Sequence, residues 1–184
     1  ARQLYAELGI TGITPPPDDL ATIQSWHEQG ANDELILMAA KAAHNKSSHS
    51  DMDDVDAYLQ DWRRRGLTTP EAVRAESART RMLNGQLREI YAAAGVEKRP
   101  NAPDRDLLCR WAGEMGMTQE LIVQAAEYAR GAGSPMMLIG RILRDWSRAG
   151  ISTLEAARQE HESHIQEIAQ KAPVLQTAQK QDAM

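Results

Sequence analysis

The stretch that decides the fold is residues 138–150, LIGRILRDWSRAG, followed by residues 151–156, ISTLEA. An earlier copy occupies residues 54–66, DVDAYLQDWRRRG, followed by residues 67–72, LTTPEA. In each copy an apolar helix face runs to a tryptophan, and a glycine four residues later predicts the end of the helix. A threonine then stands where the N-cap of a next helix belongs. The sequence therefore predicts the same helix–turn–helix segment twice.

The repeat extends upstream of this segment, with an offset of 84 to 86 residues that changes only at loops. The matching pairs are Trp62 and Trp146, Gly66 and Gly150, Glu34 and Glu120, Trp26 and Trp111, and Tyr5 and Tyr91. All four tryptophans of the chain are used in this pairing. A period this long indicates two small domains in tandem rather than a solenoid.

Composition favours helices and a core with few aromatic side chains. The 184 residues contain only 4% aromatic residues and no phenylalanine, so leucine, isoleucine, methionine and alanine must fill most of the core. The net charge is −5, which does not favour a strongly basic nucleic-acid binder; any DNA binding would need local positive patches. A single cysteine excludes an internal disulfide and fits a reducing compartment.

Helical periodicity runs through the whole chain, and no segment alternates as a strand does. We therefore predict an all-α fold with two similar small helical domains joined by a long helix. The predicted domains are residues 1–76 and 90–160, with a helical connector at residues 77–89. Residues 161–184 are expected to be a helical extension that ends near Pro173, followed by a disordered tail.

The tryptophans have two readings. An indole can stack on unpaired bases of a nucleic acid. Each of the four, however, lies on the apolar face of its predicted helix, which favours a place in the core.

The order of these signals resembles a known family. A tyrosine helix, a proline loop, Leu-x-x-Trp, Glu-Leu-Ile at residues 34–36 and 120–122, and Trp-x-x-x-Gly ending at Gly66 and Gly150 resemble the C-terminal domain of bacterial DnaD-like replication-initiation proteins. The resemblance covers residues 4–76 and 90–160. It implies a tandem pair of all-α domains from a primosome or phage replication protein, with roles in DNA binding and self-association.

The resemblance also assigns motif positions. The family's Tyr-x-x-x-Ile-x-x-x-Trp motif falls on Asp54, Tyr58 and Trp62 in the first copy. In the second copy it falls on Leu138, Ile142 and Trp146. The first tyrosine is therefore absent from both copies, and a tyrosine replaces the isoleucine in the first copy. In the family, DNA binding is associated with this region.

Candidate DNA-binding residues follow from charge and helical spacing. Arg141, Arg144 and Arg148 stand at positions i, i+3 and i+7, which places them on one face opposite Ile142 and Trp146. Such a stripe has the geometry for tracking phosphates. It is also the pattern of an ordinary solvated helix face, which is the commoner case.

The first copy offers a weaker set of cations. Its three consecutive arginines lie at a predicted helix end, where they also suit the negative pole of the helix dipole. The same helix carries aspartates that would repel phosphates. The second copy is therefore the better candidate, and two cations of its loop add to it. These additional candidates are Arg63, Arg64 and Arg65 in the first copy, and Lys98 and Arg99 in the second.

The sequence offers little for catalysis. The pair His161 and His164 has no clear third ligand for a metal. Gly131-Ala132-Gly133 lacks the lysine of a phosphate-binding loop. No nucleophilic residue stands at a sequence spacing from a base that would indicate a catalytic pair. We therefore expect no enzymatic activity, no metal and no cofactor.

The leading hypothesis is a non-catalytic DNA-binding module of a bacterial or phage replication-initiation protein. Its expected partners are single- or double-stranded DNA, bound weakly and with salt dependence, and other replication proteins. A homo-oligomer is a further possibility. The alternative is a protein-interaction or oligomerisation scaffold without DNA contact. No apolar run is long enough to span a membrane and no signal peptide is visible, so we expect a cytoplasmic location.

Overall fold

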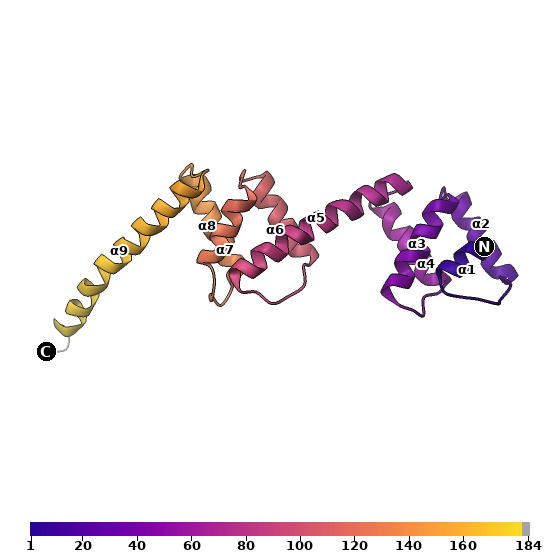
Figure 1. Ribbon diagram of the computed structural model, residues 1–184, viewed down its shortest axis with the longest axis horizontal. Helices are drawn as coiled ribbons and strands as arrows, with labels where there is room; N and C mark the ends of the chain where they lie inside the picture. Colours follow the sequence, from indigo (N-terminus) through magenta and orange to yellow (C-terminus); the bar gives the residue numbers. More distant parts are fainter. Residues whose placement is uncertain (182–184) are drawn as a thin grey trace. The chain divides into compact units, whose positions relative to one another are not determined.

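The computed structural model describes the backbone of residues 1–181 and the side chains of residues 1–170. Throughout the described backbone the regular secondary structure is helical (Figure 1). The predicted all-α fold is therefore confirmed. The chain divides into two compact units, Ala1–Thr80 and Arg81–Met184. The expected boundaries at residues 76 and 90 stay predictions, because one uninterrupted helix runs through this region.

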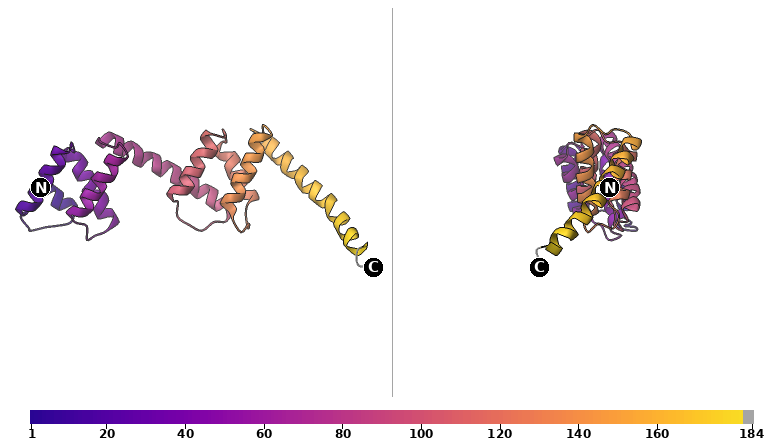
Figure 2. Two further views of the ribbon diagram at one scale, coloured as in Figure 1. Left: turned by 180° about the vertical axis from the view of Figure 1, so that it is seen from behind. Right: turned by 90° about the vertical axis from the view of Figure 1, so that its left-hand side faces the viewer.

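The first unit contains four helices and the beginning of a fifth. These are α1 (Arg2–Glu7), α2 (Pro17–Glu28), α3 (Asp33–Lys46), α4 (Met52–Arg64) and the first part of α5 (Pro70–Ala94). Helix α3 packs against both α1 and α4, as the two opposite views show (Figures 1 and 2). The core of the unit therefore forms around α3, which buries the apolar face predicted from its sequence.

The second unit repeats this plan. Its helices are the second part of α5, α6 (Ala102–Gly113), α7 (Gln119–Tyr128), α8 (Pro135–Arg148) and α9 (Leu154–Gln181). Helix α7 takes the central place of α3 and packs against α8 and α9, while α6 contacts α8. The end of α5 takes the place of α1, and Ile90 and Tyr91 lie where Leu4 and Tyr5 lie in the first unit.

The cores are built from equivalent positions. Residues 84 positions apart fill the same places: Val55 and Ile139, Leu59 and Leu143, Trp62 and Trp146, and Val73 and Ala157. All four tryptophans are buried; the most exposed retains 8% of its surface. The core reading of the tryptophans is therefore confirmed, and none presents a free face for stacking on bases.

The predicted turn after each tryptophan helix is present in both copies. Gly66 and Gly150 have φ angles of +73° and +71°, which a residue with a Cβ adopts only at a cost. Behind each glycine the next amide returns to the tryptophan carbonyl, at 2.8 and 2.9 Å. Thr69 and Thr153 then accept backbone amides three residues on, both at 3.2 Å. These contacts confirm the predicted helix stop and the two threonine N-caps.

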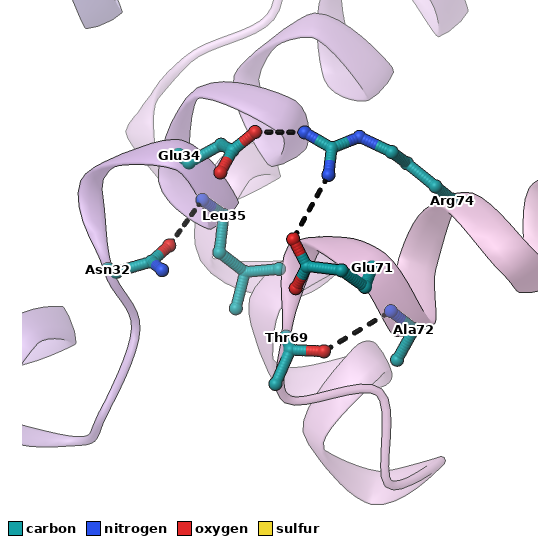
Figure 3. A network of polar contacts seen from close by, with 7 residues as sticks. All are labelled: Asn32, Glu34, Leu35, Thr69, Glu71, Ala72 and Arg74. Carbon is teal, nitrogen blue, oxygen red and sulfur yellow. Dashed lines mark hydrogen bonds and ion pairs between the residues drawn. The ribbon is translucent and has the colours of Figure 1, made fainter.

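A polar network ties α5 to α3 in the first unit (Figure 3). Arg74 of α5 pairs with Glu34 at the start of α3 and, at 3.3 Å, with Glu71 on its own helix. Beside this network Asn32 caps α3 and Thr69 caps α5. The charged side chains are about half exposed or more, so the ion pairs contribute little to stability; the caps fix where both helices begin.

Each unit also contains a tyrosine–aspartate hydrogen bond that links its first two helical segments. The Tyr5 hydroxyl donates to Asp19, and the Tyr91 hydroxyl donates to Asp104. The bond to Asp19, together with burial, raises the pKa of Tyr5 to about 12. The repeat predicts the pair of tyrosines but not the aspartates that accept from them. These two hydrogen bonds are findings of the structure.

The last helix differs from its prediction. Helix α9 begins at Leu154, directly after the Thr153 cap, and continues past Pro173 to Gln181. The prediction that Pro173 ends it is wrong. A proline inside a helix removes one backbone hydrogen bond and crowds the preceding turn, yet the helix can continue on both sides. The disordered tail expected after Pro173 is therefore helical as far as Gln181, and its last residues, 182–184, lie outside the described residues.

We predict equal dependence of the two units on their equivalent leucines. Leu59→Ala and Leu143→Ala each remove a buried side chain, so each should lower the free energy of unfolding of its unit by about 2–5 kcal/mol. Urea unfolding followed by circular dichroism measures the loss. Leu20→Ala is the control, because Leu20 is 48% exposed, and should change stability by less than about 0.5 kcal/mol. Equal losses in all three variants would contradict the assignment of the cores.

Candidate nucleic-acid interface

Helix α8 has one buried face and one cationic face. Ile139, Leu143 and Trp146 are buried in the core of the second unit. Arg141 and Arg144 are exposed on the opposite side, and Arg148 continues the same face one turn later. The predicted stripe of three arginines therefore exists, and the core fixes its direction because the apolar face cannot turn toward water.

The end of α8 is anchored through its tryptophan. The Trp146 Nε1–H donates to Glu160 of α9 at 3.1 Å. Its ring meets Tyr128 edge-on, with centroids 6.2 Å apart, and Tyr128 stacks on His161 at 3.6 Å. These contacts hold α7, α8 and α9 together. The arginine face is thus presented by a fixed helix rather than by a loop.

Most arginines of the stripe have no hydrogen-bond or ion-pair partner among the described residues. Within the described part of the chain, Arg141 and Arg144 make no hydrogen bond or ion pair. Arg148 lies 3.9 Å from Asp145, but both side chains are more than half exposed. Such a pair is weak and exchanges readily with water or another anion. The stripe therefore offers guanidinium groups that are not committed to the fold.

The first-copy arginines are arranged differently, because each has a partner. Arg63 donates to the Gln29 side chain at 2.6 Å and to its carbonyl at 3.2 Å. Arg64 pairs with Asp61 at 3.4 Å, and Arg65 pairs with Glu76 at 2.7 Å. The contacts of Arg63 and Arg65 fasten the end of α4 to the end of α2 and to α5, and the pair of Arg64 lies within α4. They agree with the structural reading of this triplet.

The two loop cations also differ from each other. The Lys98 ammonium lies 2.6 Å from Asp104, whose side chain is only 8% exposed, and stands 5.2 Å from the centre of the Tyr91 ring. Burial raises the pKa of Asp104, but the hydrogen bonds from Lys98 and Tyr91 outweigh it and leave the pKa below its ordinary value. Lys98 therefore has a structural partner. Arg99 is exposed and makes no hydrogen bond or ion pair with another described residue.

The family motif positions lie mostly in the cores. Trp62 and Trp146 are buried, and Tyr58 and Ile142 are half-buried against the same apolar clusters. Tyr58 meets Trp62 edge-on, with centroids 6.0 Å apart. These side chains support their helices, and the groups that reach solvent are the arginines beside them.

A comparison with protein-family sequence models identifies the family of the chain. The model of the family described as replication initiation and membrane attachment matches residues 10–77 and again residues 97–161. Together the two segments cover well over half of the chain. The chain belongs to this family. The split match falls on the two units and confirms the tandem pair of DnaD-like domains expected from the sequence.

No curated protein and no solved structure matches the chain. The description of the replication initiation and membrane attachment family names a membrane, and none of the described helices combines the length and apolarity needed to cross one. Among the described residues, no three or more histidine, cysteine or acidic side chains gather as a metal site would require.

We predict that alanine substitutions at Lys98 and Arg99 have different effects on stability. Lys98→Ala removes the partner of a buried carboxylate and should lower the free energy of unfolding by about 1 kcal/mol, a modest value because the lysine is 39% exposed. Arg99→Ala is the matched control and should have an effect below about 0.5 kcal/mol. Chemical denaturation at neutral pH measures both; equal losses would contradict the role of Lys98.

The pH dependence of this loss has a definite sign. The folded chain lowers the pKa of Asp104 below its ordinary value of 3.8, so the ionised carboxylate stabilises the fold above that pH. The stabilisation is lost as the pH falls through the lowered pKa. The difference between Lys98→Ala and the unmodified chain should therefore be full at neutral pH and shrink below pH 3.8. A difference that grows with acidification would contradict this account.

Proposed function

We propose that this chain is a non-catalytic DNA-binding module of a replication-initiation protein. The proposal combines its family membership with the exposed stripe of Arg141, Arg144 and Arg148 on α8. Each guanidinium can bind a phosphate oxygen without reading base identity. The expected ligands are therefore single- or double-stranded DNA, bound without strong sequence preference, and the module acts beside other replication proteins.

The observation that carries the proposal is the difference between the two α8-like helices. In the first unit Arg63 and Arg65 hold neighbouring elements of the fold and Arg64 pairs with Asp61 of its own helix. Exposed Asp53 stands on the same helix. In the second unit two of the three stripe arginines have no described partner, and the third has only a weak one. A net charge of −5 makes such a local cationic face the part of the molecule best suited to a polyanion.

We predict a steep salt dependence that the stripe controls. If three phosphates are contacted, replacing Arg141, Arg144 and Arg148 with alanine should reduce the slope of log K against log salt by about 2.7 on duplex DNA. Fluorescence anisotropy with labelled single- and double-stranded oligonucleotides, over a series of salt concentrations, measures the slope. The substitutions remove exposed side chains, so the thermal unfolding of the variant should stay close to that of the original chain.

The matched control removes the same number of charges from the first unit. Arg63→Ala, Arg64→Ala and Arg65→Ala together change the net charge identically, but these arginines are paired within the fold. The control should keep most of the salt slope while losing some stability. DNA binding that is absent at low salt, or that falls equally in both triple variants, would contradict the proposal.

The alternative of an interaction scaffold has one supporting observation. Beyond Glu160, the described side chains of α9 are largely exposed, including Ile165 and Ile168 at 51% and 56%. A scaffold would use this apolar pair for self-association. Sedimentation velocity separates the two functions: self-association that is insensitive to DNA and lost in Ile165→Ser with Ile168→Ser favours the scaffold. A monomer that binds DNA through the stripe favours our proposal.

A further inference from the structure

The two units differ in the hydrogen-bond acceptor that they offer to the indole N–H of the tryptophan in their second helix. In the first unit the Trp26 Nε1–H donates to the Asp56 carboxylate of α4 at 2.8 Å. The residue 84 positions later, on α8, is Gly140. A Cβ at Gly140 would stand 3.5 Å from Nε1 of Trp111, which is the counterpart of Trp26. The carboxylate that completes the first unit is therefore missing from the second.

The consequence is an indole donor without an acceptor. Trp111 is only 2% exposed, and its Nε1–H donates to no other residue in the described part of the chain. Its counterpart Trp26 and its neighbour Trp146 both donate to carboxylates. Trp62, at 8% exposed, also has no acceptor among the described residues. Trp111 lines an opening of the surface, so an acceptor from outside can reach its N–H group.

That opening is a groove between α6 and α8, with a volume of about 380 Å³. Its apolar walls come mainly from thioether side chains, which adapt their shape to a partner, and Met137 is 77% exposed. Two arginines and one glutamate supply its charges. The lining residues that matter here are Trp111, Met115, Met136, Met137, Arg110 and Arg144.

We propose that this groove binds an acidic, apolar peptide segment of a partner protein. One carboxylate of the peptide takes the role that Asp56 has in the first unit and accepts the Trp111 Nε1–H. Arg110 and Arg144 compensate its charge, and apolar residues beside it pack on the methionines. The first unit thus supplies the template for the contact that the second unit leaves open.

The chemistry favours a peptide over a nucleic acid. Glu114 also lines the groove and would repel a backbone that carries a charge at every phosphate. A single carboxylate can place its charge beside the arginines instead. The proposal goes beyond DNA binding, because Arg141 and Arg148 do not line the groove; only Arg144 belongs to both surfaces.

The test observes the Trp111 indole directly. The ¹⁵N-labelled chain is titrated with a short helical peptide that carries one aspartate between leucines on the same face, and the four indole N–H signals are followed by NMR. Substitution of each tryptophan by phenylalanine assigns the signals. The Trp111 signal alone should shift strongly. The same peptide with asparagine in place of aspartate should bind at least about tenfold more weakly.

Two matched variants complete the test. Gly140→Asp restores the residue of the first unit and supplies an internal acceptor for the Trp111 N–H. It should therefore weaken binding of the peptide by about tenfold or more. Gly85→Asp is the control, because it adds the same charge at a helical glycine with open space around it and should leave binding unchanged. Arg110→Gln should also weaken binding of the peptide. Arg110 is exposed, so this variant should fold, and the test does not depend on Gly140→Asp alone.

Several results would overturn the proposal. These are no shift at Trp111 with the aspartate peptide, equal shifts with the asparagine peptide, or unchanged binding by Gly140→Asp. A Trp111 shift with oligodeoxythymidine but not with the peptide would assign the groove to nucleic acid instead. Failure of DNA binding at the stripe, with the Trp111 shift intact, would contradict the proposed function and leave this inference standing.

Discussion

Each unit of this protein depends on burying two indole rings in a core that has few other large side chains. An indole fills much volume but brings an N–H group that needs an acceptor once it leaves water. Trp26 donates to Asp56 and Trp146 donates to Glu160, so carboxylates of neighbouring helices at the edge of each core accept from the buried rings. The helix stops, the caps and the tyrosine–aspartate bonds then place those helices where the acceptors can reach the rings.

The same constraint shows how two copies of one unit have diverged. The first copy keeps Asp56 against its indole and uses its arginines to hold its own helices together. The second copy has a glycine at the equivalent place, an unpaired indole N–H and arginines that face solvent. The equivalent positions therefore hold the fold together in the first copy and face solvent or the groove in the second. Membership of the replication initiation and membrane attachment family gives these groups a biological setting.

Local signals made much of the fold predictable. The tryptophan–glycine spacing, the threonine caps and the helical periodicity act within a few residues, so the sequence alone indicates where helices end and which face is buried. Contacts between elements were not predictable in the same way. The bond from Tyr91 to Asp104 and the capture of Lys98 depend on how segments meet in space. Pro173 failed as a stop signal because one lost hydrogen bond need not end a long helix.

The most direct test of the central claim is the environment of the two equivalent indoles. Nuclear Overhauser contacts measured on the full chain should place the Trp26 ring against Asp56 and the Trp111 ring against Gly140, 84 residues further along. Both contacts in one sample would establish that a single helical unit occurs twice and differs at this position. Absence of either contact, or an indole ring surrounded by solvent, would contradict the account.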